Sequence, residues 1–340
     1  MHAVVFDGHG GNEVVRAIER PDPVAGTREV VIGVQYTGVN PADVGQRLGR
    51  YPSPIGAPED IGGIEVAGVV LECGPHSHRW QPGDRVFGLV DGGGFASRVV
   101  AHERCLARVP RGLEDPDAAA APEAFITAHD ALVANGAFRP GDRVLVNGAS
   151  GGVGAAALQL VVALGGVAVG TCRSPEGLRL IEELGATAVT GDDLLRHGGE
   201  VVGEIDLVVE LVGGPNLERD LEVLAHRGRI VLVGTPAGDS AADLSIRPLL
   251  RKRASMVGTT LRNRPLEEKA AAVRAFEHEV VPLLARRLVR SYVDSTFPFD
   301  QAGAAFDRLA ESGKRGKVLL RFPTADSSAA MGTSEGRAAG

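Results

Sequence analysis

The residues best suited to chemistry lie in a glycine-rich loop, from Asn147 to Gly154, between an apolar stretch and a helical one. Gly151 lets the backbone approach a pyrophosphate, and Gly154 lets the following helix pack closely against a sheet. The free N–H groups of Gly152 and Val153 then point at the anion from the start of that helix. The pattern predicts a bound nucleotide that carries phosphates.

One position departs from the usual G-x-G-x-x-G spacing, because Ala149 stands where the first glycine is common. We interpret this as a slightly different turn. A helix start that merely tolerates glycine is the alternative, and it is disfavoured because further strands and helices alternate along the chain after the loop.

Arg173 and Ser174 follow the next predicted strand, where an NAD-selective protein would normally present an acid to the ribose 2′-hydroxyl. A guanidinium fork and a hydroxyl instead suit a 2′-phosphate. The sequence therefore favours NADPH over NADH. The alternative is that Arg173 is an ordinary solvated surface arginine.

The chain divides into three parts by its hydrophobic pattern. The first has short strands separated by Gly and Pro, which predicts a small β-rich barrel, and the second alternates strands with helices, which predicts a parallel sheet covered on both faces. The predicted strands are 29–36, 64–71, 85–90 and 98–101, then 143–147, 167–171, 186–189, 206–210, 229–234 and 255–259. The third part is expected to rejoin the first. Its predicted helices are 266–284 and 300–310, and its predicted short strands lie around 289–293 and 317–322.

Composition limits the classes of function. A chain of 340 residues with 44% hydrophobic residues predicts two globular domains, and a net charge of -7 argues against a nucleic-acid-binding surface. The sequence shows neither an apolar run of about 18 residues nor a secretory signal, so we expect no membrane partner. Cys73, Cys105 and Cys172 are odd in number and widely spaced, which predicts a cytoplasmic protein without a disulfide framework or a structural zinc lobe.

Several motifs together resemble the zinc-independent quinone oxidoreductases of the medium-chain dehydrogenase/reductase superfamily, the group that includes zeta-crystallin. Besides the glycine loop they are Asn40–Asp43 with Arg47–Pro52, Gly63–Gly68, Pro82–Gly88, Gly92–Ala96, Pro122–Ala128 and Gly316–Val318. They follow in order from residue 1 to about 322. Gly92–Gly94, Pro122–Ala124 and Thr260–Arg264 look closest to the branch of p53-inducible quinone-oxidoreductase-like proteins.

The resemblance implies an α/β fold in which a GroES-like β-rich catalytic domain, residues 1–122 and 265–322, receives a Rossmann doubly wound parallel-sheet domain, residues 123–264. NADPH is expected in the cleft between them. Residues 323–340 hold little apolar surface and are expected to form a disordered tail. Family members pair their last Rossmann strands, here around 256–260, so we expect a homodimer that covers this sheet edge.

The same resemblance implies an enzyme without zinc. The metal ligands of the alcohol dehydrogenases in this superfamily fall on Asn40 and Ile64, and near Glu123. An isoleucine and a lone carboxylate do not build a tetrahedral zinc site. We therefore predict no metal.

Without zinc, side-chain donors must polarise the acceptor, and Asn40 and Tyr51 are the candidates. Tyr51 is expected at the rim of the cleft, and Asn40 at a strand end. A packing tyrosine and a turn-stabilising asparagine are the alternatives. Thr127 resembles the family threonine beside the nicotinamide, although it can equally be a helical threonine that bonds back to the preceding turn.

The predicted cofactor contacts come from several segments. They are Asn40, Thr127, Ser150, Gly151, Gly152, Val153, Gly154, Arg173, Ser174, Val233, Gly234, Thr235, Thr260, Leu261 and Arg262. A tyrosine that the family places after the third strand of the nucleotide-binding sheet is missing, and Thr190-Gly191-Asp192 stands there. That departure puts more of the 2′-phosphate recognition on Arg173.

These observations predict a zinc-free, NADPH-dependent oxidoreductase that transfers hydride to a quinone or an α,β-unsaturated carbonyl, with Tyr51 and Asn40 steadying the developing enolate. One alternative is a reductase of enoyl thioesters or a secondary-metabolite tailoring enzyme, for which the predicted basic rim would be Arg47, Arg50, Arg262 and Arg264. Another is a non-catalytic NADPH-binding sensor or structural protein, against which the intact Asn40, Tyr51 and glycine loop argue.

Overall fold

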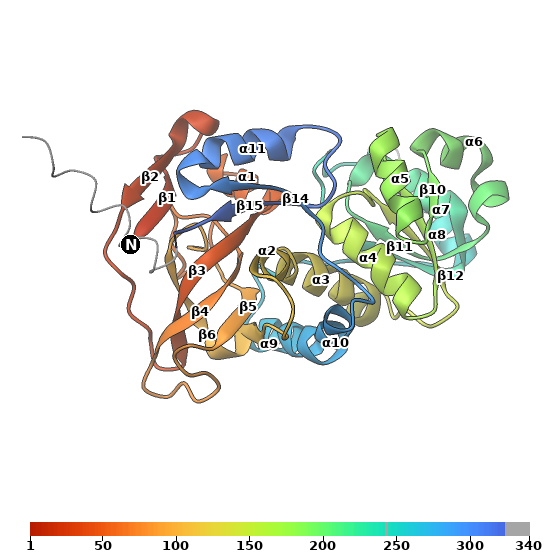
Figure 1. Cartoon of the computed structure of the whole chain (residues 1–340). Helices are drawn as coiled ribbons and strands as arrows, with labels where there is room; N and C mark the ends of the chain where they lie inside the picture. The colour runs from red at the N-terminus through yellow and green to blue at the C-terminus, as the bar shows by residue number, and fades with distance from the viewer. Residues whose placement is uncertain (242–243, 324–340) are drawn as a thin grey trace, which may run out of the picture.

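Two β-sheets, joined through a layer of helices, organise the chain (Figure 1). The computed structural model describes residues 1–241 and 244–323. One sheet is antiparallel for most of its width and the other is wholly parallel. This arrangement confirms the predicted α/β class.

The first sheet is built from both ends of the chain. Its strands, in spatial order, are β14 (Val293–Pro298), β15 (Lys317–Arg321), β3 (Glu29–Val39), β4 (Glu65–Cys73), β5 (Arg85–Leu89) and β7 (Leu106–Arg108), and β6 (Arg98–His102) also pairs with β3. Antiparallel pairing of β15 with β3, with Val318 opposite Val39, brings the end of the chain back to its beginning. A separate hairpin of β1 (His2–Phe6) and β2 (Val15–Glu19), which the sequence reading missed, packs on this half.

The second sheet has six parallel strands. Their spatial order is β10 (Thr187–Val189), β9 (Val167–Thr171), β8 (Arg143–Asn147), β11 (Ile205–Glu210), β12 (Leu224–Leu232) and β13 (Ser255–Gly258). Numbered along the chain this is the 3-2-1-4-5-6 order of the Rossmann fold, with its switch point between β8 and β11. Ligands of such sheets bind outside the carboxyl ends of the strands at that point.

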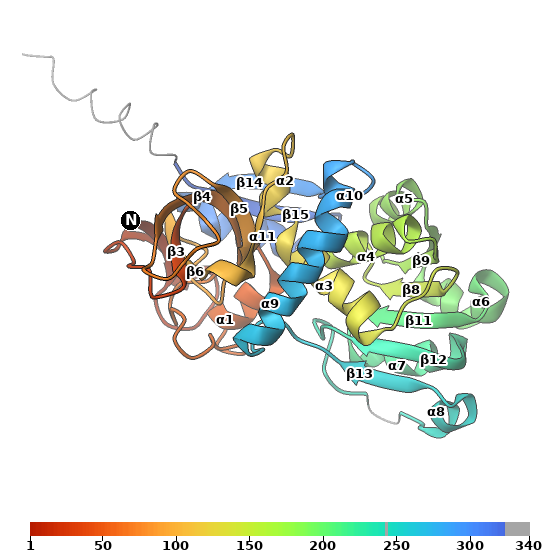
Figure 2. The same ribbon diagram turned by 90° about the horizontal axis from the view of Figure 1, so that it is seen from below.

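Helices cover the parallel sheet and fill the space between the two halves. Those beside the parallel sheet are α4 (Gly152–Ala163), α5 (Pro175–Glu183), α6 (Gly191–Val202), α7 (Leu217–Val223) and α8 (Arg247–Lys252). Figure 2 shows α3 (Pro122–His129), α9 (Leu266–Ala275) and α10 (Val281–Ala285) lying between the sheets. The remaining helices, on the first half, are α1 (Pro41–Arg47), α2 (Asp115–Ala119) and α11 (Ala302–Ala310). No helix of the described residues is both long and apolar enough to cross a bilayer.

A single apolar core reaches from one half into the other. Phe87 of β5 and Phe276, just after α9, pack with their ring centroids 5.3 Å apart, and both belong to the cluster that contains Leu158 of α4 and Val209 of β11. Because closely packed interiors resist deformation, this shared core holds the two halves in one arrangement. The two halves are therefore built on a common support.

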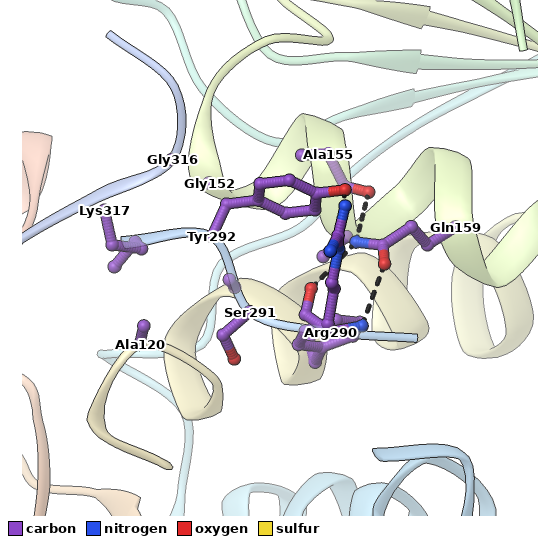
Figure 3. Close-up of a pocket in the computed structure, with 12 residues that line it drawn as sticks. Ala120, Gly152, Ala155, Gln159, Arg290, Ser291, Tyr292, Gly316 and Lys317 are labelled. Carbon is purple, nitrogen blue, oxygen red and sulfur yellow. Dashed lines mark hydrogen bonds between the residues drawn. The ribbon is translucent and has the colours of Figure 1, made fainter. Parts of the chain in front are cut away.

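The strand predicted around 289–293 is wrong, because the observed strand β14 begins only at Val293. Gln159 of α4 explains the difference, since its side-chain amide donates to the backbone oxygen of Arg290 at 3.0 Å and accepts from the Arg290 N–H at 2.9 Å (Figure 3). Both backbone groups of Arg290 are thus used by a side chain and not by a strand. Strand β12 also differs, because it begins at Leu224, earlier than predicted.

The tail predicted to be disordered lies, apart from Pro323, outside the described residues.

Candidate active site

The glycine loop ends β8 and starts α4 with a bare helix N-terminus. Gly151 precedes the helix in an extended conformation, and no side chain caps the first turn. A Cβ added to Gly151 would meet only the Gly148 oxygen, at 3.5 Å, whereas one added to Gly154 would lie 2.5 Å from that same oxygen. Gly151 therefore leaves room for a ligand, and Gly154 permits close packing, as a phosphate-binding loop requires.

Ala149 fits the loop because its neighbours make room for it. The positive φ of the turn, 75°, is taken by Gly148, so Ala149 needs no unusual conformation. Its methyl group is buried against Gly170 of β9, where an added Cβ would lie 2.7 Å from it. The departure from the usual glycine pattern is thus compensated by Gly148 in the turn and by Gly170 on the neighbouring strand β9.

The residues predicted for the 2′-phosphate gather at the carboxyl end of β9. Ser174 caps α5, and its hydroxyl accepts a hydrogen bond from the Gly177 N–H at 3.1 Å. Ser150 lies against the same turn, since a Cβ on Gly177 would be 3.0 Å from its hydroxyl oxygen. Arg173 is exposed and makes no hydrogen bond or ion pair with other described residues, so its guanidinium is available to an anion.

Beyond the third strand of this sheet, Thr190 is occupied locally. Its hydroxyl accepts from the Asp193 N–H at 3.1 Å and donates to the Asp193 carboxylate at 2.6 Å. This arrangement starts helix α6 and leaves Arg173 as the basic group nearest to the end of β9 in sequence.

A buried polar network connects the half that contains the first sheet to the glycine loop. We call this half the catalytic half, after the role that the family resemblance predicts for it. Asn40 caps α1, and its amide N–H groups donate to Glu65 Oε1 at 2.9 Å and to the Gly38 oxygen at 3.2 Å, while its Oδ1 accepts from Lys317 Nζ. The Lys317 ammonium lies 2.5 Å from the same Glu65 oxygen, and Glu65 is fully buried. The two N–H donors of Asn40 are therefore engaged within the protein, and Asn40 orients the charged pair.

Asp43 fixes the start of α1 and with it Asn40. Its two carboxylate oxygens accept from the N–H groups of Asn40 and Gly63, each at 2.8 Å. Burial raises the pKa of Asp43 to about 6, although these hydrogen bonds oppose that change. The loop that leads into β4 at Gly63 and the helix start at Asn40 are thus held together by one carboxyl group.

Thr127 faces Glu123 one turn earlier on α3. Its hydroxyl donates to Glu123 Oε1 at 3.1 Å, so it bonds to a side chain instead of to the preceding backbone turn. The Glu123 N–H in turn donates to Glu65 Oε2 at 2.9 Å. Burial and the nearby Glu65 raise the pKa of Glu123 to about 7. Thr127 is thereby connected to the same network as Asn40.

The network touches the glycine loop through the stem of Lys317. A Cβ on Gly152 would lie 2.6 Å from Lys317 Cδ, so a side chain at the first residue of α4 would push this lysine out of its position. Figure 3 shows both residues lining the small cavity next to Tyr292. The end of the parallel sheet that suits phosphates and the polar centre of the catalytic half are therefore adjacent.

A second set of polar contacts joins the two halves at Tyr51. Its hydroxyl lies 3.1 Å from that of Thr260, which follows β13. The Arg262 guanidinium lies over the Tyr51 ring, 5.4 Å from its centroid, and donates to Gln46 at 2.6 Å and to Ser53 at 3.2 Å. Arg262 is 7% exposed, so it connects the two halves from inside and does not present a free cation at the rim.

The segment that carries Thr260 is itself anchored to α3. Arg264 donates with two nitrogens to the Asp130 carboxylate, at 2.8 and 2.7 Å, and Thr259 donates to the same group at 2.9 Å. Leu261 is buried beneath the segment. The predicted contacts Val233, Gly234 and Thr235 lie at the end of β12, where Thr235 is exposed and the other two are half-buried.

Sequence reasoning missed Glu65, Lys317 and Glu123 as members of the site, although each lies within a motif quoted for the family resemblance. Glu65 is a charged residue in the apolar stretch Ile64–Val70, and a buried charge requires a partner. That signal indicates a partner but does not identify Lys317, which is far away in sequence.

The arrangement does not fit a catalytic zinc ion. Ile64 offers no donor, and the Asn40 amide is engaged with Glu65 and Lys317. Among residues 1–241 and 244–323, the structure has no group of three or more His, Cys, Asp and Glu side chains placed to hold a metal. The three cysteines are free.

Comparisons with known proteins agree with both halves of the fold. The sequence model of the alcohol dehydrogenase GroES-like domain matches residues 26–111, and that of the zinc-binding dehydrogenase matches residues 152–277. A polyketide synthase system protein, NorB of Streptomyces orinoci, is 33% identical over 93% of this chain, which spans 14% of that protein.

Several relatives that match over nearly their whole length are quinone oxidoreductases. The human quinone oxidoreductase is 31% identical over 333 residues, which is 94% of this chain and 97% of the human one. The quinone oxidoreductase of Thermus thermophilus, solved also as its complex with NADPH, is 35% identical, and the match covers 95% of this chain and 100% of that one with a TM-score of 0.82. The chain belongs to the quinone oxidoreductase family of the medium-chain dehydrogenase/reductase superfamily.

Proposed function

We propose that this protein is a zinc-free, NADPH-dependent oxidoreductase that transfers hydride from the nicotinamide to a quinone or an α,β-unsaturated carbonyl. The observation that carries the proposal is the contact between Gly152 and Lys317. The first residue of α4 lies against Lys317 of the polar network, and this supports a dinucleotide whose diphosphate lies at the helix start and whose nicotinamide end lies toward Asn40 and Thr127. The NADPH complex of the Thermus thermophilus relative supports the choice of cofactor.

In this proposal the cofactor-binding residues fit NADPH by their chemistry. The backbone of Gly151, Gly152, Val153 and Gly154 and the hydroxyl of Ser150 bind the diphosphate, Arg173 and Ser174 bind the 2′-phosphate, and Val233, Gly234, Thr235, Thr260 and Leu261 line the nicotinamide half. NADPH supplies the hydride when it is bound. The exposed, unpaired guanidinium of Arg173 supports its part in this set.

Tyr51 is the proposed donor to the acceptor oxygen on which negative charge develops. Its hydroxyl is oriented by Thr260 and its ring is held by Arg262. Asn40 acts through its contacts, because its N–H groups are already used on Glu65 and Gly38, and it keeps the Glu65–Lys317 pair in place. Donors that are positioned before the reaction need no reorganisation when charge appears.

A reductase of enoyl thioesters is the second candidate, and the similarity to a polyketide synthase protein favours it. The predicted basic rim speaks against it. Arg47 donates to Asn12 and lies over Phe306, Arg262 is buried, and Arg264 pairs with Asp130, so of the four rim arginines only Arg50 is exposed. A non-catalytic role is disfavoured because the polar network is complete around Asn40.

An acceptor panel tests the proposal. NADPH oxidation is followed by the loss of nicotinamide absorbance with benzoquinones, naphthoquinones, enones and an enoyl-CoA, and NADH is run in parallel. We expect turnover with quinones or enones and a preference for NADPH. Turnover with the enoyl-CoA alone would establish the second candidate, and NADPH binding without oxidation of any kind would establish a non-catalytic role.

We further propose that two copies pair through β13. This strand lies at the edge of the parallel sheet, bonded to β12 on one side and to no other described strand. Nearby apolar side chains are exposed, namely Val257 at 38%, Ile246 at 64% and Leu250 at 71%. A second β13 would satisfy the open edge and cover them. Light scattering that gives the mass of one chain at micromolar concentration would refute this dimer.

The proposed division of labour assigns residues 1–122 and 265–322 to the acceptor and residues 123–264 to NADPH. The odd number and wide spacing of the cysteines support a cytoplasmic location.

A further inference from the structure

The proposed function leaves Glu123 without a role, although its carboxyl group lies inside the polar network. Glu123 is the second residue of α3 and is half-buried. One carboxylate oxygen accepts the Thr127 hydroxyl at 3.1 Å, and its backbone N–H is bonded to Glu65. The side chain is therefore held in a defined position next to a residue that we place beside the nicotinamide.

The surroundings of Glu123 contain both signs of charge. The groups that face it are Glu65 from β4, Asp43 from α1 and Lys317 from β15, and at the far end of α3 His129 pairs with Glu279 at 2.8 Å. Helix α4, which packs along α3, carries no ionisable side chain. Lys317 is already the counter-ion of Glu65, at 2.5 Å. An ionised Glu123 therefore has to share the Lys317 charge with Glu65.

Both protonation states of Glu123 are accessible near neutral pH. Burial and the Glu65 carboxylate raise the pKa of Glu123 to about 7, and Lys317 and the Thr127 hydroxyl limit the rise. A positive charge introduced nearby would favour the carboxylate. The oxidised nicotinamide ring carries such a charge, and the reduced ring does not.

We propose that Glu123 is a positioning residue whose proton is released when the nicotinamide becomes oxidised, so that its carboxylate, through Thr127, stabilises the cationic ring. The inference rests on the proposed function, because it takes the nicotinamide to lie beside Thr127. The acceptor gains the hydride from the nicotinamide and a proton through the Tyr51 hydroxyl, which water reprotonates, and together these complete a two-electron reduction. Glu123 gives its own proton to water. Glu123 regains a proton from water when the oxidised cofactor leaves.

A linkage between cofactor affinity and pH follows. If NADP⁺ lowers the pKa of Glu123, then NADP⁺ must bind more tightly as that carboxyl ionises, and NADPH must not. An opposite charge within about 6 Å shifts a carboxyl pKa by 1 to 3 units. The Kd of NADPH divided by the Kd of NADP⁺ should therefore rise by about tenfold or more as the pH increases to neutral, and then level off. The 2′-phosphate is common to both cofactors, so its own ionisation cancels in this ratio.

The experiment measures the Kd of both cofactors between about pH 5.5 and 8 for the unmodified protein and for Glu123→Gln. We expect the Kd ratio to rise about tenfold with pH in the unmodified protein. In Glu123→Gln the ratio should stay constant, because glutamine does not titrate. Calorimetry of NADP⁺ binding in two buffers of different ionisation enthalpy should show proton release that Glu123→Gln abolishes.

Two further variants keep the test decisive. Thr127→Val retains the carboxyl but removes the hydroxyl through which it acts, so both cofactors should still bind while the rise in the Kd ratio becomes smaller than in the unmodified protein. Asp117→Asn is the matched control, because burial also raises the pKa of Asp117, which lies on α2, and the ratio should there rise as in the unmodified protein.

A ratio that stays constant with pH in the unmodified protein, or a rise that survives Glu123→Gln, would overturn the role of Glu123 and leave the proposed function intact. Failure to bind either cofactor would instead contradict the proposed function, and this role with it.

Discussion

The hydroxyl of Tyr51 lies 3.1 Å from that of Thr260, and this contact joins the catalytic half to the segment after the last strand of the parallel sheet. Arg262, two residues further on, lies over the same tyrosine ring. The tyrosine proposed to serve the acceptor is therefore positioned by residues from the nucleotide-binding half. In this proposal the cofactor site and the acceptor site share one support.

Replacing Tyr51 by Phe should lower kcat by about 100-fold, since a positioned proton or hydrogen-bond donor contributes roughly 10² to 10⁴ in rate. The Kd of NADPH should change little, because the proposed contact is to the acceptor. Steady-state kinetics together with direct NADPH binding check this. Thr260→Ser, which retains a hydroxyl, is the control and should stay close to the unmodified protein. Unchanged turnover in Tyr51→Phe would remove Tyr51 from the mechanism.

Arg173→Ala should weaken NADPH binding roughly 10- to 100-fold, because hydrogen bonds to a charged group contribute about 1.5 to 3 kcal/mol. NADH has no 2′-phosphate, so its affinity should stay the same and the preference for NADPH should disappear. Fluorescence titration with both cofactors measures this. Arg179→Ala, an exposed arginine one turn into α5, is the matched control. Equal losses for NADPH and NADH would contradict the assignment.

Lys317→Met should destabilise the fold by about 3 to 5 kcal/mol, since it leaves the buried Glu65 carboxylate without its counter-ion. The double variant Glu65→Gln, Lys317→Met should regain part of that loss, because no uncompensated charge remains. Arg315→Ala breaks an ion pair with Glu183 whose side chains are 45% and 49% exposed, and it should cost less than about 1 kcal/mol. Urea unfolding compares the three, and similar losses in all would argue against the buried pair.

Asp220 should make stability depend on pH. Burial and the adjacent Glu210 raise the pKa of Asp220 well above 3.8, so the folded protein keeps a proton that the unfolded chain loses. The contribution is fully present below about pH 3.8 and falls as the pH rises toward the pKa of the folded state. Asp220→Asn removes that dependence because asparagine does not titrate, and its amide oxygen can still accept from the Asn147 N–H. Thermal unfolding should show a shallower pH slope in Asp220→Asn, and parallel slopes would contradict this.

Most of the fold could be predicted because its signals are local. The strands 143–147 and 167–171 agree with β8 and β9 residue for residue, since each is a short apolar run that ends at a loop. The predicted ends of strands were wrong where a side chain that is distant in sequence decides them. Gln159 does so at Arg290, because it binds both backbone groups of that residue. The hairpin of β1 and β2 was missed because β2 holds two charged residues and no fully buried side chain, so its apolar signal is weak.

The candidate site was predictable only in part, and for the same reason. Asn40, Tyr51 and Thr127 follow from motifs that are continuous in sequence. The pairing of Glu65 with Lys317 depends on the antiparallel pairing of β15 with β3 and of β3 with β4, which no local pattern specifies. The use of both Asn40 N–H groups within the protein likewise emerges only from the packed structure.

The most direct test of the account is the rate of NADPH oxidation with a quinone, measured with cofactor that carries deuterium in place of the transferred hydrogen at C4 of the nicotinamide. The account predicts oxidation of one NADPH for each two-electron reduction of the quinone, slowed by the deuterium because the C4 bond breaks in the reaction. Tight NADPH binding with no oxidation by quinones or enones would contradict it.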